Sequence, residues 1–155
     1  MCPYLTRHII DLWFWDISGT SDNGDVVEAD RILASTVVTI IGGDAVVGHA
    51  LELLLRSAEC DARFISESSL AEEVGALERA ELLLIAPGLS SARNEELLSM
   101  LRATEATKNL PVMELTSNIA ATRLGIRHFV APWPCPTEEL QRQIREVLLS
   151  GRERA

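Results

Sequence analysis

The strongest constraint on the fold is a regular alternation of apolar runs and amphipathic segments that begins near residue 35. The first run, TVVTII at 36–41, is rich in β-branched side chains, which is typical of a strand buried on both faces. Residues 45–58 follow with apolar side chains at helical spacing. The pattern then repeats, with strands predicted at 62–65, 81–86, 111–116 and 127–131 and helices at 69–80, 94–106, 118–124 and 138–149.

Three hydroxyl side chains mark predicted helix starts. Ser69 and Glu72 have the spacing of a capping box. Ser91 follows a Pro-Gly turn, and Thr137 precedes the last apolar stripe, so each is a predicted N-cap.

Strands that alternate with helices predict a parallel sheet, because each parallel crossover places a helix on the sheet. The predicted fold class is α/β: a flavodoxin-like, doubly wound five-stranded parallel sheet of order 2-1-3-4-5 with helices on both faces, built from about 120 residues. In such sheets the functional crevice lies at the carboxyl ends of the strands. The residues that follow each strand are therefore the first place to search for a site.

The first 34 residues have a different character and are predicted to be an aromatic arm followed by an acidic linker. Residues 35–151 form the predicted α/β domain, and 152–155 a tail. Trp13, Phe14 and Trp15 should be covered, because exposed rings would form a large apolar patch. The arm either packs on its own domain or docks on another subunit.

The charge balance argues against a nucleic-acid partner. There are 14 Lys and Arg residues against 23 Asp and Glu residues, a net charge of -9, whereas phosphate binding needs a basic surface. No apolar run approaches the ~18 residues of a membrane span. The three cysteines are widely spaced, which favours a reducing cytoplasm, and the three histidines have no ligand spacing for a metal.

Two stretches resemble the receiver domains of two-component response regulators, and the resemblance covers about residues 36–149. SARNEELLSMLRATEATKNLPVMELTS, at 91–117, is similar to the receiver segment from the third helix through the fourth strand. GIRHFVAPWPCPTEEL, at 125–140, is similar to the fifth strand, the proline turn and the start of the last helix. The resemblance implies a role in signal transduction.

The same resemblance implies a phosphorylation site whose key residues are missing here. The acidic pair that holds magnesium in the family matches Gly42 and Gly43, and only Asp44 follows. The phosphoryl-accepting aspartate matches Ala86. Magnesium needs several oxygen ligands in near-octahedral geometry, and acyl-phosphate chemistry needs a carboxylate nucleophile. We therefore expect neither magnesium binding nor a stable aspartyl phosphate.

Two further positions complete the comparison with the family. The lysine that contacts the phosphoryl group matches Ala131 or Pro132, and the switch hydroxyl is kept as Thr116. The chain thus resembles a degenerate pseudo-receiver, and we expect no enzymatic activity and no cofactor. The expected function is a phosphorylation-independent interaction module that binds a protein partner or itself.

Two other functions remain open from the residues. The chain could be a phosphorylatable regulator that uses Asp44 or another carboxylate. It could also be a Rossmann-like nucleotide-binding domain that uses the Gly42-Gly43-Gly48 turn, with Glu67 at the ribose. Against nucleotide binding, Ala45 replaces the middle glycine, and Asp44 places negative charge where a pyrophosphate would lie.

The segment around the fifth strand carries a second candidate interface. Receivers commonly make contacts with this face, and here it contains Ile126, Arg127, Phe129 and Trp133 before the proline-rich turn PWPCP. Proline lowers the entropy lost on docking, and Trp supplies a large anchor. We expect a homodimer or a protein partner on this face or on the aromatic arm. The alternative is that Phe129 fills the core and the arm covers its own sheet edge.

Overall fold

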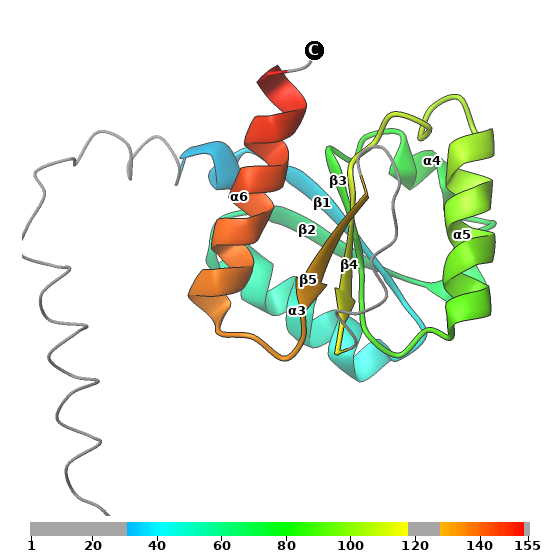
Figure 1. Ribbon diagram of the computed structural model, residues 1–155, viewed down its shortest axis with the longest axis horizontal. Helices are drawn as coiled ribbons and strands as arrows, with labels where there is room; N and C mark the ends of the chain where they lie inside the picture. The colour runs from blue at the N-terminus through cyan, green and yellow to red at the C-terminus, as the bar shows by residue number, and fades with distance from the viewer. Residues whose placement is uncertain (1–30, 118–127, 154–155) are drawn as a thin grey trace, which may run out of the picture. The chain divides into compact units, whose positions relative to one another are not determined.

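The computed structural model describes residues 31–117 and 128–153 (Figure 1). Five parallel strands form one sheet of order β2-β1-β3-β4-β5, which confirms the predicted flavodoxin-like topology. The register sets Gly42 beside Ser66 and Ile41 beside Ile85. The strands are β1 (Val37–Gly42), β2 (Asp61–Ser66), β3 (Leu82–Ile85), β4 (Val112–Thr116) and β5 (His128–Pro132).

Helices cover both faces of the sheet, with α3 and α6 on one side and α4 and α5 on the other (Figure 1). Residues 31–34 add a helical turn whose Leu33 is buried in the core of the α3 side. The helices are α3 (Ala45–Ser57), α4 (Val74–Leu77), α5 (Ser91–Ala103) and α6 (Thr137–Glu153), with a 3-10 turn η1 (Glu67–Ser69) before α4.

The core has two layers because the central strand is apolar on both faces. All four side chains of β3 are fully buried. Leu82 and Leu84 point to the α3 and α6 side, whereas Leu83 and Ile85 point to the α4 and α5 side. Successive side chains of a strand alternate between faces, so a continuous apolar run is what a doubly covered strand requires.

The predicted helix at 69–80 is wrong over most of its length. Ser69 lies inside η1 instead of capping a helix, and α4 spans only Val74–Leu77 after Glu73, which makes no side-chain cap bond. Leu70 and Leu77 are buried and anchor the segment at two points. Gly75 lies inside α4 itself, so its low helix propensity does not explain the turns at 70–72.

Two other predicted caps are shifted by one residue. Ser90, not Ser91, caps α5, and its Oγ accepts the Arg93 N–H at 3.3 Å. Thr137 is the first residue of α6, where the Leu140 N–H donates to the Pro136 carbonyl at 3.1 Å. The predicted helix at 118–124 lies outside the described residues.

Candidate functional site

The floor of the candidate site, where β1 and β3 end side by side, is small and apolar. Gly42 is buried, and Ala86, which follows β3, is 2 % exposed. A Cβ on Gly42 would lie 2.9 Å from the Ala86 Cβ, closer than real Cβ atoms approach. The two backbones can meet this closely only because one residue is glycine. The first matched position of the acidic pair, Gly42, and the matched phosphoacceptor position, Ala86, thus form a packed contact without a carboxylate.

Asp44 uses its carboxylate to cap α3. Its Oδ1 accepts the Val46 N–H at 2.8 Å and the Val47 N–H at 3.3 Å. An aspartate at the N-cap satisfies backbone donors that have no partner within the helix and interacts favourably with the helix dipole. The one carboxylate that follows β1 therefore has a structural role, and it already occupies the helix N-terminus at which a phosphate would bind.

A second carboxylate reaches the site from the neighbouring strand end. A Cβ built on Gly43 would lie 3.7 Å from Glu67 Oε2 and 3.4 Å from Leu89 Cδ2. Glu67 also forms an ion pair with Arg93, whose Nε lies 2.8 Å from Glu67 Oε1. The hydrogen bond to Glu96, together with the charge of Glu67, raises the pKa of Arg93. Glu67 is thus held beside Gly43 as the partner of an arginine.

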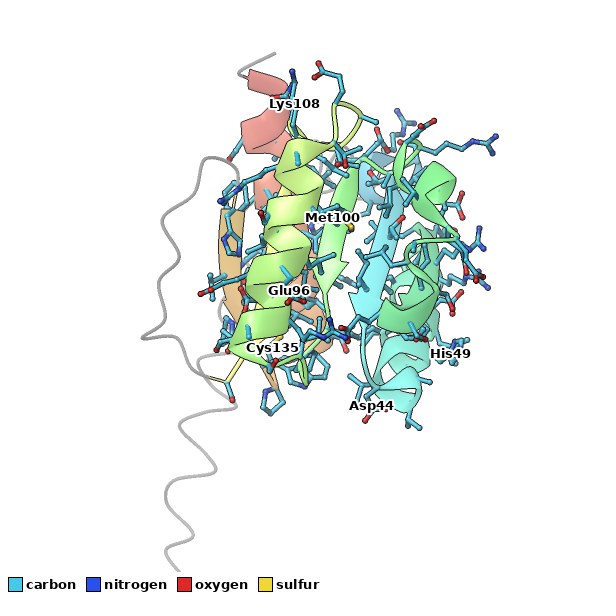
Figure 2. The ribbon with its side chains drawn as sticks, turned by 90° about the vertical axis from the view of Figure 1, so that its right-hand side faces the viewer. Asp44, His49, Glu96, Met100, Lys108 and Cys135 are labelled. Carbon is cyan, nitrogen blue, oxygen red and sulfur yellow. The ribbon has the colours of Figure 1, made fainter. Side chains whose placement is uncertain are left out.

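The remaining receiver-like positions lie on β4 and β5. Thr116 ends β4 and is partly exposed, and its carbonyl accepts the Trp133 N–H at 3.0 Å. Ala131 is buried in the core of the α3 and α6 side and has no polar side chain to offer. Lys108 is the only lysine of the chain, and it pairs with Glu105 at 2.5 Å. Figure 2 shows Lys108 at the end of the molecule opposite Asp44.

The glycine-rich turn has a packing role in this structure. A Cβ on Gly48 would lie 2.2 Å from the Cε2 atom of Phe64. Gly48 therefore lets α3 approach β2 closely over the Phe64 ring, which His49 also contacts edge-on at a centroid distance of 5.0 Å. Close packing of the helix on the sheet explains this glycine without a bound phosphate.

A buried polar cluster that was not predicted from the sequence lies between α5, β4 and β5 and is formed by Asn94, Glu114 and His128. Asn94 Nδ2 donates to Glu114 Oε1 at 2.7 Å, and His128 Nε2 lies 3.3 Å from Glu114 Oε2. The His128 side chain is 2 % exposed and that of Glu114 is 10 % exposed. The available signal was a carboxylate inside the apolar run PVMELT, because a buried charge needs nearby partners.

The candidate interface around β5 is only partly within the described residues. Phe129 and Trp133 are half-buried, and both pack against the core on the α3 and α6 side. Trp13, Phe14, Trp15, Ile126 and Arg127 lie outside the described residues.

The described cysteines and histidines form no metal centre. Burial raises the pKa of Cys60, and burial together with the nearby Glu139 raises the pKa of Cys135. Within 31–117 and 128–153, no group of three or more His, Cys, Asp or Glu side chains is placed to hold a metal ion. No helix in the same part of the chain is long and apolar enough to cross a membrane.

Comparison with known proteins gives structural relatives only, since no protein-family model and no curated protein sequence matches the chain. A sensor protein from Polaromonas superposes with a TM-score of 0.61 at 15% identity, over 75% of this chain and 98% of that one. A response regulator receiver domain protein from Bacillus halodurans superposes with a TM-score of 0.59 at 16% identity, over 73% of this chain and 97% of that one.

A third relative is the receiver domain of a signal transduction histidine kinase from Syntrophus aciditrophicus. It gives a TM-score of 0.57 at 16% identity, over 74% of this chain and 91% of that one. These identities are low, and a shared fold does not by itself establish function. The chain therefore has the fold of response regulator receiver domains.

Proposed function

We propose that this chain is a degenerate receiver that acts as a phosphorylation-independent protein–protein interaction module in signalling, without enzymatic activity. The observation that carries the proposal is the packed floor of the candidate site. Gly42 and Ala86 offer no side-chain oxygen, and the 2.9 Å separation that a Gly42 Cβ would have from Ala86 Cβ leaves no room for a side chain. A receiver fold without an acceptor can still present its surfaces to a partner.

The same geometry weighs against the two other functions. At the candidate site, the carboxylates that a phosphorylatable regulator could use are Asp44, which caps α3, and Glu67, which pairs with Arg93 at 2.8 Å. Phosphorylation of either would break an existing interaction without a second carboxylate pair to bind magnesium. A nucleotide would have to compete with Asp44 for the backbone donors of α3.

The proposed partner is a protein or a second copy of the chain, with a homodimer as one outcome. Phe129 and Trp133 present aromatic surface beside the proline-rich turn, and the arm carries Trp13, Phe14 and Trp15. The net charge of -9 argues against nucleic acid as a partner. The free thiols of Cys60 and Cys135 are consistent with a cytoplasmic location.

We expect association to be insensitive to phosphodonors. Light scattering of the full chain should give the same mass and the same partner complex with and without acetyl phosphate and magnesium, because Gly42, Gly43 and Ala86 supply no acceptor carboxylate at the candidate site. Loss of the complex in Trp133→Ala alone assigns contact to the β5 end, and loss only on removal of residues 1–30 assigns it to the arm. A complex that forms or dissolves on adding acetyl phosphate would contradict the proposal.

A further inference from the structure

A hollow lies on the α4 and α5 side of the domain, between the segment 67–71 and α5. Its volume is about 310 Å³, and its apolar lining residues are Leu70, Ala71, Leu89, Leu97 and Met100. Leu70 and Leu97 are buried, whereas Met100 is 38 % exposed. A flexible methionine beside buried leucines offers an adaptable apolar contact to an incoming side chain. We call this hollow the η1–α5 groove.

Three charged side chains line the same groove. Arg93 Nε lies 2.8 Å from Glu67 Oε1, and Arg93 Nη1 donates to Glu96 Oε2 at 2.9 Å. A single arginine thus pairs with two carboxylates. Among the described residues that line the groove, no other is charged, so two negative charges against one positive charge leave the lining with a net charge of -1.

Glu96 is the carboxylate of the groove that faces solvent. Its side chain is 68 % exposed, against 28 % for Glu67. Glu96 and Met100 lie four residues apart on α5, a spacing that sets side chains next to each other on one face of a helix (Figure 2). An apolar contact and an accessible negative charge are therefore neighbours at the edge of the groove.

We propose that the η1–α5 groove binds a basic amphipathic segment of another protein, which places an apolar side chain against Met100 and a Lys or Arg side chain beside Glu96. This inference rests on the proposed interaction role, and it names a surface and a partner chemistry for it. The incoming cation balances the charge of a cluster in which one arginine serves two carboxylates. Charge complementarity of this kind selects the partner and speeds its association.

The charges argue against a second copy of the chain as the occupant of this groove. A two-fold contact sets the same patch of both copies together. Two clusters of Glu67, Arg93 and Glu96 would then meet, each with a net negative charge. The whole chain also carries a net charge of -9, which repels its own copies and attracts a basic partner at long range.

The first test measures binding of a synthetic peptide to the full chain by fluorescence anisotropy. The probe is an amphipathic helical peptide of about 14 residues, roughly four turns, with leucines on one face and lysines on the other. Glu96→Lys should raise its dissociation constant at least about tenfold, because an attraction becomes a repulsion. Glu95→Lys is the matched control, since Glu95 is also exposed on α5 but does not line the groove. This variant should bind the peptide like the original chain.

The second test separates the apolar contact from the charge. Met100→Ser should raise the dissociation constant of the same peptide by about fivefold, because the partner loses part of its buried apolar area. Leu149→Ser is the matched control, since Leu149 is 43 % exposed but lies on α6. A peptide with glutamates in place of the lysines should bind at least about tenfold more weakly than the lysine peptide.

Four outcomes would overturn the inference. The first is no binding of the lysine peptide at millimolar concentrations, and the second is equal weakening by Glu95→Lys and Glu96→Lys. The third is binding only after removal of residues 1–30, which would assign the groove to the arm. The fourth is self-association that Met100→Ser abolishes, which would assign the groove to a second copy.

All of these measurements use unphosphorylated protein. Uptake of a phosphoryl group would contradict the proposed function and not the groove, so the two failures can be told apart.

Discussion

Gly48→Ala is expected to destabilise the protein, although replacement of glycine by alanine inside a helix normally stabilises it by up to about 1 kcal/mol. The new Cβ would lie 2.2 to 2.6 Å from three atoms of the Phe64 ring. The ring would have to move out of its contact with the core and with His49. Such overpacking lowers the free energy of unfolding by about 1–3 kcal/mol. Urea unfolding followed by fluorescence measures the change.

Gly75→Ala is the matched control for this expectation. A Cβ on Gly75 meets nothing within 4 Å, so the substitution should leave stability unchanged or raise it. Combining Gly48→Ala with Phe64→Leu should restore part of the free energy of unfolding that Gly48→Ala removes. The two sites are in contact, so their effects are not additive. If Gly48→Ala raises the free energy of unfolding as much as Gly75→Ala does, then α3 does not pack closely on Phe64 of β2 at Gly48.

The second large effect is expected from Glu114→Ala. This substitution removes the acceptor of the Asn94 amide and the carboxylate beside His128, while both partners stay buried. A buried polar group that loses its partner costs about 1–3 kcal/mol, and more where a charge is involved. We expect the free energy of unfolding to fall by about 2–4 kcal/mol. Chemical unfolding at neutral pH gives the value directly.

Two further variants separate the buried cluster from a general charge effect. Glu105→Ala removes an 86% exposed carboxylate paired with Lys108 and should change stability by less than about 1 kcal/mol. Glu114→Gln keeps an acceptor oxygen for Asn94. Its free energy of unfolding should therefore lie between those of Glu114→Ala and Glu105→Ala. Equal stability of Glu114→Ala and Glu105→Ala would mean that the cluster contributes nothing to the fold.

Strands β1 and β3 were predictable because they are buried on both faces, whereas β2 (DARFIS) alternates exposed and buried residues. A run such as TVVTII or ELLLIA has no polar face to place in water, so only a doubly covered strand accommodates it. The helix predicted at 69–80 was wrong because tertiary contacts override the local signal there. Ser69 and Glu72 have the spacing of a capping box, but the buried Leu70 and Leu77 hold the segment in turns that tertiary contacts select.

The candidate site was predictable only as a set of positions. The sequence places Gly42, Asp44 and Ala86 after strands that end at the same edge of the sheet. The role of Asp44 as the N-cap of α3 was not predicted, although aspartate is a preferred residue before a helix. The partners of Glu114 were not predictable, because Asn94 and His128 come from elements 20 and 14 positions away and meet only in the folded chain.

The central claim is that the receiver fold is kept without a phosphoacceptor, and intact-mass measurement after incubation with acetyl phosphate and magnesium tests it most directly. We predict that the mass of the full chain stays unchanged, because Gly42, Gly43 and Ala86 offer no carboxylate and Asp44 caps α3. A gain of one phosphoryl group that disappears in Asp44→Asn or Glu67→Gln would contradict the account and identify the acceptor.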